Sequence, residues 1–131
     1  MKLLLDEPGT SEARLAWQEA EQRTASVALL AEGRAALAAA QRANRITLAQ
    51  HRTMVEGFAG LWLEMDGIVL TEELAERAGE LAETFALRSY DAVHLASAEV
   101  VADPDTILVT SDRDLASAAA SLGIVAVIPA A

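Results

Sequence analysis

The chain has 131 residues, which suffice for one compact domain with a core of its own and leave no room for a second. It has no cysteine, which excludes a disulfide framework and a thiolate metal site and favours a reducing cytoplasm. The net charge of −10 is unusual for a binder of polyanions, although carboxylates that hold divalent cations, or attract a basic partner, contribute to such a charge.

The sequence also indicates where the protein resides. No run approaches the roughly 18 apolar residues of a membrane helix. The opening MKLLLDEPGT is too short and too soon charged for a signal peptide. We therefore expect a single cytoplasmic domain over residues 1–131 with no membrane association.

Helical patterns dominate the first half of the chain. Apolar residues recur at helical spacing in three segments, which predict helices over residues 11–23, 27–43 and 48–64. Thr10 or Ser11 is the expected cap of the first helix. Thr24–Ser26, which follows a polar turn, predicts a brief strand that leads into the second helix.

In the second half, short apolar runs alternate with helical segments. The runs at 68–70, 107–110 and 125–128 predict strands, and helices are expected from Thr71 to about Phe85, from Ser89 onward, and up to Gly123. This alternation implies βα units and a mainly parallel sheet with helices on both faces. The fold class is therefore α/β.

Three carboxylates occupy unusual positions. Glu32 lies on an Ala/Leu helix that offers it no neutralising partner, so it either reaches solvent at the core edge or faces a metal. Asp91 lies in the first turn of a mostly apolar helix, where the helix dipole is one sufficient explanation. Asp112 follows a buried strand, where open parallel sheets bind ligands, but Ser111 and Asp114 there also match a capping box.

Four segments, KLLLDEPGTSEAR, SVALLAEGRAALAAA, LRSYDAVHLASA and ILVTSDRDLASAA, resemble in order the motifs of PIN-domain proteins of the VapC toxin type. The resemblance spans nearly the whole chain. It implies a three-layer α/β/α fold, a site of four carboxylates with Mg²⁺ or Mn²⁺, cleavage of single-stranded RNA, and a cognate VapB-like antitoxin. It also favours a homodimer formed through helices that carry Trp17, Phe58 and Trp62.

By motif position, the resemblance assigns the second, third and fourth acidic residues of the family to Glu32, Asp91 and Asp112, with Asp114 as an assisting neighbour. We expect the first three to converge on one pocket. His94 is expected to be a packed or hydrogen-bonded residue rather than a ligand.

The family's first strand and its aspartate are expected to precede this chain, so that neither Asp6 nor Glu7 fills that position. The gene product then starts upstream, or this form is shortened and less active. Three functions follow from this interpretation: a Mg²⁺-dependent RNA endonuclease, a catalytically silent PIN-fold module that binds antitoxin or RNA, and an α/β interaction protein whose acidic residues are all structural.

Overall fold

The computed structural model describes residues 2–5 and 11–129, with side chains from residue 14 onward. This part of the chain forms one parallel sheet with strand order β3-β2-β1-β4-β5, together with helices α1 to α6. In chain order the elements are β1 Lys2–Leu5, α1 Ser11–Glu19, β2 Gln22–Ser26, α2 Ala28–Arg42, α3 Leu48–Leu63, β3 Asp66–Ile68, α4 Glu72–Phe85, α5 Ser89–Val101, β4 Thr106–Val109, α6 Arg113–Ser121 and β5 Val125–Val127.

The prediction that the first strand is missing is wrong. Lys2–Leu5 forms β1, the central strand, which pairs in parallel with β2 on one side and β4 on the other. The three consecutive leucines of KLLL are typical of a strand inside a parallel sheet. The motif comparison had placed the family's first strand upstream of this run. Asp6 and Glu7 lie outside the described residues, so the prediction about them stays untested.

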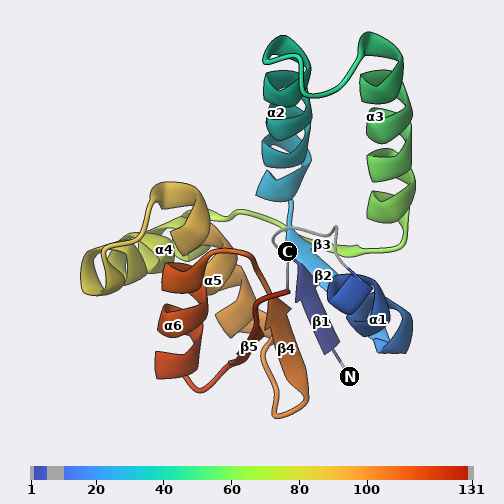
Figure 1. Cartoon of the computed structure of the whole chain (residues 1–131). Coiled ribbons are helices and arrows are strands. Elements are labelled where there is room, and N and C mark those ends of the chain that lie inside the picture. Colours follow the sequence, from blue (N-terminus) through green and yellow to red (C-terminus); the bar gives the residue numbers. More distant parts are fainter. Residues whose placement is uncertain (1, 6–10, 130–131) are drawn as a thin grey trace.

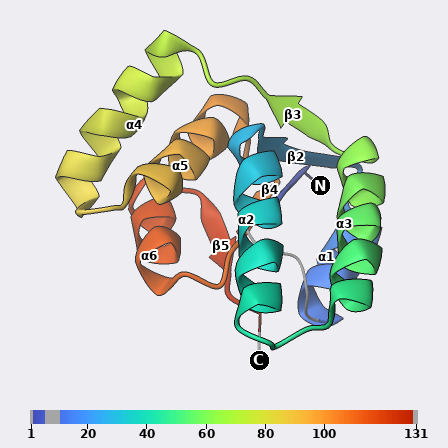
Figure 2. The same cartoon turned by 90° about the horizontal axis from the view of Figure 1, so that it is seen from above.

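The elements form three layers, as the sequence predicted. One face of the sheet carries α1, and the other carries α5 and α6, with α4 packed on the outside of α5 (Figures 1 and 2). Side chains of β4 alternate between the two faces, because successive residues of a strand point in opposite directions. Leu108 joins the core beneath α4 to α6, whereas Ile107 and Val109 pack with Trp17 and Ala20 on the α1 side.

Helices α2 and α3 form a hairpin that projects beyond the carboxyl edge of the sheet (Figure 1). Its two helices pack closely because Gly33 has no side chain: a Cβ there would lie 2.6 Å from the Phe58 ring. Leu29 is the buried residue of α2, and α3 has none. The hairpin is thus covered much less than the sheet. No helix in the described part of the chain is long and apolar enough to cross a membrane.

Several element boundaries differ from the sequence prediction. The third strand was expected at 68–70 but lies at Asp66–Ile68, where Thr24 pairs with Asp66 and Ser26 with Ile68. Val69 and Leu70 are exposed. Their apolar character suggested a strand, but β2 ends at Ser26, which pairs with Ile68, so no residue of β2 is left to pair with Val69 and Leu70. The first helix ends at Glu19, because the chain already joins the sheet at Gln22.

An ion pair fixes α4 against α5, the helix that carries Asp91 and His94. Arg77 donates from Nε to Glu99 Oε1 at 2.7 Å and from Nη2 to Glu99 Oε2 at 2.8 Å. Hydrogen bonding to Arg77 lowers the pKa of Glu99 below its ordinary value, against the opposing effect of burial. A carboxyl whose pKa is lower in the folded protein stabilises the fold above its unfolded pKa and loses that contribution as the pH falls through its folded pKa.

We therefore expect Glu99→Gln to lower the melting temperature near pH 7 and to have a much smaller effect at about pH 3, where Glu99 is increasingly protonated in the wild type too. Thermal unfolding followed by circular dichroism measures this difference. Glu83→Gln, an exposed change on α4, is the matched control. An equally large effect of Glu99→Gln at both pH values would contradict the role given to the ion pair.

Candidate functional site

Asp91 lies in the first turn of α5 and is buried, with 7% of its surface exposed. The helix begins at Ser89, as expected, and its N-cap Arg88 makes no side-chain capping hydrogen bond. The helix dipole favours a carboxylate in this turn, but a buried charge also requires a partner. Arg88 supplies it by donating from Nε to Asp91 Oδ2 at 3.1 Å.

Asp112 stands between the carboxyl end of β4 and the start of α6. It is itself the N-cap of α6, since its Oδ1 accepts a hydrogen bond from the Leu115 amide at 2.9 Å. The expected capping box of Ser111 and Asp114 is therefore wrong. The Asp112 amide in turn donates to the hydroxyl oxygen of the fully buried Thr110 at 3.1 Å. These two bonds hold the Asp112 side chain at the edge of the sheet.

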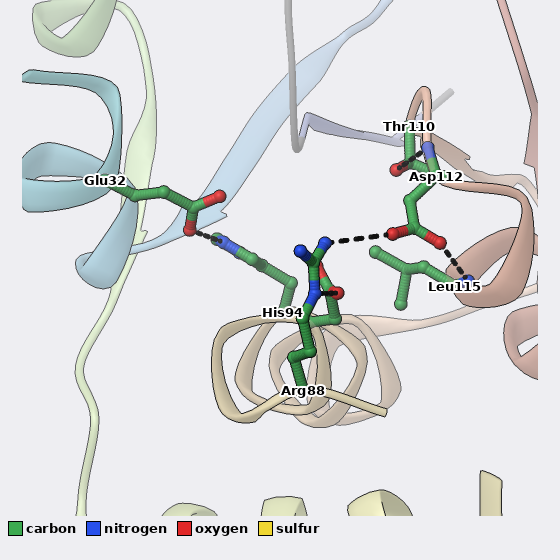
Figure 3. A network of polar contacts seen from close by, with 7 residues as sticks. Glu32, Arg88, His94, Thr110, Asp112 and Leu115 are labelled. Atoms are coloured by element: carbon green, nitrogen blue, oxygen red, sulfur yellow. Dashed lines mark hydrogen bonds and ion pairs between the residues drawn. The ribbon is translucent and has the colours of Figure 1, made fainter. Parts of the chain in front are cut away.

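One guanidinium group joins the two aspartates. Besides its bond to Asp91, Arg88 donates from Nη2 to Asp112 Oδ2 at 3.3 Å, so that Asp112 uses one oxygen for the cap and the other for the ion pair (Figure 3). The hydrogen bond that Arg88 donates to Asp91, followed by attraction to Asp91 and Asp112, raises the pKa of Arg88. Arg88 therefore stays protonated and carries its charge between the two carboxylates.

Glu32 reaches across from α2 to α5. Its Oε2 lies 2.7 Å from His94 Nε2, and the His94 side chain is only 4% exposed (Figure 3). His94 follows Asp91 by three residues on α5, which places the two side chains on the same side of that helix. The interpretation of His94 as a hydrogen-bonded residue is confirmed. The contact supplies a partner for Glu32 that its own helix lacks.

The structure brings together only part of the predicted carboxylate site. Asp91 and Asp112 share Arg88, whereas Glu32 bonds to His94, and Asp114 is exposed in the first turn of α6. In residues 2–5 and 11–129, no three Asp, Glu or His side chains are arranged to hold one metal ion. The convergence of all three carboxylates on one pocket stays a prediction; the contact that the structure shows for Glu32 is the one with His94.

The pair Asp91 and Asp112 nevertheless fits a divalent cation of the Mg²⁺ kind. Such ions prefer carboxylate oxygens and are often held by one or two carboxylates, with waters and phosphates completing the coordination. The guanidinium of Arg88 stands in for such a positive charge, since it contacts an oxygen of each aspartate. Sequence reasoning missed Arg88, although an arginine three residues before Asp91, at a helix start, is a recognisable signal.

Comparisons with known proteins identify the family of this chain. Residues 1–121, which include β1, match the family described as PIN domain. Ribonuclease VapC45 of Mycobacterium tuberculosis (strain CDC 1551 / Oshkosh) is 37% identical over 123 residues, covering 94% of this chain and 85% of the relative. The chain belongs to the VapC family of PIN-domain proteins. Ribonuclease VapC49 of Mycobacterium tuberculosis (strain ATCC 25618 / H37Rv) shows the same identity and coverage. The predicted family and the three-layer PIN fold are thereby confirmed.

The contact between Glu32 and His94 should couple the hairpin energetically to α5. In a double-mutant cycle with Glu32→Ala and His94→Ala, we expect a coupling free energy of about 0.5–3 kcal/mol, because each change leaves the other polar group without this partner. Urea unfolding of the four proteins measures it. Glu56→Ala with His94→Ala is the control, and its effects should add within about 0.5 kcal/mol. Additive effects for the Glu32 pair would show that the contact does not stabilise the fold.

Proposed function

We propose that this protein is a Mg²⁺-dependent endoribonuclease toxin of a toxin–antitoxin pair, with Asp91 and Asp112 as its principal metal ligands. The observation that carries the proposal is that these two carboxylates, from the starts of two different helices, face one positive charge at the carboxyl edge of the sheet. That edge is where parallel α/β sheets bind ligands. The relatives named ribonucleases support the same reaction class.

Phosphodiester hydrolysis needs a positioned water and positive charge at the phosphate oxygens, which carboxylate-held Mg²⁺, or Mn²⁺, supplies when bound. The protein's own part is to hold the oxygen ligands in place. Thr110 and the Leu115 amide fix Asp112, and the first turn of α5 fixes Asp91. We assign Glu32 a direct or water-mediated role toward the cation and Asp114 an assisting one. Because Glu32 is already bonded to His94, both residues would orient the site together.

The distribution of charge supports RNA as the substrate despite the net charge of −10. The hairpin of α2 and α3, residues 28–63, holds four arginines and two glutamates, so its net charge is +2 and the remaining residues carry −12. All four are exposed, namely Arg34, Arg42, Arg45 and Arg52. The hairpin projects from the edge of the sheet at which Asp112 lies (Figure 1). A basic arm there would attract the phosphates of single-stranded RNA.

We further propose a VapB-like antitoxin and a second copy of this chain as protein partners, in the cytoplasm. The acidic remainder of the surface would attract a basic antitoxin segment. The aromatic residues first expected to support a homodimer pack within the chain. The Arg23 guanidinium carbon lies over the Trp17 ring, 4.8 Å from the ring centre, and the Phe58 ring packs against Gly33. The exposed apolar side chains of α3 support the dimer instead, namely Leu48, Met54, Leu61 and Leu63.

The alternative function is a catalytically silent PIN-fold module that binds antitoxin or RNA. Its support was the expected absence of the family's first aspartate. The presence of β1 removes the accompanying expectation that the first strand is lost, whereas the position of the first aspartate stays untested. The expectation that this form is much less active than an extended one rested on both losses. We therefore propose that the 131-residue chain itself cleaves RNA.

Asp91→Asn and Asp112→Asn should each lower the rate of RNA cleavage about 10²-fold to 10³-fold, since each removes a negative ligand. Asparagine is a good N-cap, so Asp112→Asn should retain the bond to Leu115 and the fold. Cleavage of a labelled single-stranded RNA with increasing Mg²⁺ measures the rates, with Glu83→Gln as the control. If both variants cleave as fast as the wild type, with the same metal dependence, the proposed site is wrong.

Asp6→Asn belongs in the same series. Asp6 lies outside the described residues, but it directly follows Leu5, the last residue of the central strand, just as Asp112 follows the neighbouring β4 closely in sequence. We expect Asp6→Asn to reduce cleavage strongly. Glu7→Gln makes the same change of charge at the next residue and should retain most of the activity. Equal activities of the two variants would support the earlier view that Asp6 does not belong to the site.

Light scattering at tens of micromolar should report a dimer. Met54→Glu should shift it toward monomer, because a charge is costly in a buried apolar interface. Leu15→Glu introduces the same charge at an exposed apolar residue of α1 and should leave the dimer intact. A wild-type protein that is strictly monomeric at this concentration would refute the dimer proposal.

A further inference from the structure

Arg88 combines three properties that suggest more than a structural ion pair. Its guanidinium bonds to both Asp91 and Asp112, which come from the starts of different helices. Its side chain is 82% exposed, so little packing holds it in this position. As the N-cap of α5 it makes no side-chain capping bond, so the helix does not depend on its side chain.

The carboxylate oxygens that accept hydrogen bonds from Arg88 cannot bind a divalent cation at the same time. Asp91 Oδ2 and Asp112 Oδ2 accept the bonds from Arg88. The other oxygen of Asp112 already accepts the Leu115 amide. Arg88 must therefore release Asp112 Oδ2 before that oxygen can bind a metal ion. Exposed ion pairs are weak and arginine is long and flexible, so this release costs little.

We propose that Arg88 is an exchangeable counter-ion of the site: without metal it neutralises Asp91 and Asp112, and once released it binds a phosphate of the RNA substrate. This inference rests on the proposed metal-dependent nuclease function. It adds a regulatory competition between Arg88 and the metal and assigns Arg88 to substrate binding.

The chemistry of the side chain supports both states. A guanidinium forms charge-assisted hydrogen bonds with carboxylates and phosphates alike. The hydrogen bond to Asp91, followed by attraction to the two aspartates, raises the pKa of Arg88 in the paired state, and an arginine side chain remains protonated when it is released as well. When released, Arg88 remains tethered at the start of α5, next to the oxygens that would hold the metal. A phosphate bound to that metal would then lie within reach of the side chain, and the repulsion between RNA and an acidic protein would be locally reduced.

The competition predicts that removing Arg88 strengthens metal binding. Arg88→Met should bind Mn²⁺ about tenfold more tightly than wild type by calorimetry, because no bonds between Arg88 and the carboxylates must be broken before the metal binds. The matched control is Arg113→Met, which removes an equal, exposed charge next to Asp112. Arg113 forms no ion pair with either aspartate. Arg88→Lys, which lacks the two-pronged geometry, should give an intermediate affinity.

The same variant should bind RNA less well. At saturating Mg²⁺, we expect Arg88→Met to raise the KM for single-stranded RNA about tenfold with little change in kcat. The reason is that the lost contact to phosphate binds the substrate and the transition state equally. A merely structural role would instead lower the stability and leave metal affinity unchanged or weaker. Circular dichroism confirms that the variants are folded before either measurement.

The outcomes separate this inference from the proposed function. Tighter Mn²⁺ binding with a higher KM supports the exchange. Unchanged Mn²⁺ affinity in Arg88→Met, or an increase no greater than in Arg113→Met, overturns the competition, and an unchanged KM overturns the phosphate role. The double variant Asp91→Asn/Asp112→Asn tests the site itself. If it binds Mn²⁺ as tightly as wild type, the proposed metal site fails and the Arg88 inference fails with it.

Discussion

The pairing of β1 with two neighbouring strands determines the arrangement of the whole molecule. On one side it aligns with β2, from which the hairpin of α2 and α3 continues, and on the other side with β4, which leads to Asp112 and α6. The sheet order places β1 as the connection between these halves. Because the strands are parallel, the segments after β2 and β4 begin at the same edge. A strand of four residues thus brings Glu32 and Asp112 to one region of the protein.

Compensation of negative charge is the second constraint on this region. A carboxylate removed from water is costly unless it is paired and hydrogen-bonded. Each acidic residue has a different partner: Asp91 bonds to Arg88, Asp112 to both Arg88 and the Leu115 amide, and Glu32 to His94. These partners also set the orientation of each carboxylate. The hydrogen bonds that satisfy these carboxylates therefore also orient the oxygens that would bind a cation.

The overall acidity of the chain conceals an uneven distribution of charge. The hairpin is basic, whereas the remainder of the chain carries the entire negative excess. Its helices also pack differently, since α4 to α6 surround a common core while α3 buries none of its residues. A projecting, sparsely packed and basic element next to an acidic site suits contacts with other molecules. An element of the core could not expose its apolar face in this way without destabilising the fold.

The α/β class, the family, most helices and the three unusual acidic residues could be predicted from the amino-acid sequence alone. Local patterns suffice for these features: helical spacing in α2, the cap at Thr71 of α4, and continuous apolar strands such as β4 each reflect neighbouring residues. Only the tertiary structure decided that KLLL is the central strand, because pairing with β2 and β4 involves residues about 20 and 104 positions away. It also decided that Arg88 bridges Asp91 and Asp112, and that Glu32, 62 residues from His94, bonds to it. Contacts between distant segments leave no local pattern, since nothing near Arg88 or Glu32 in the sequence indicates the partner on the other segment.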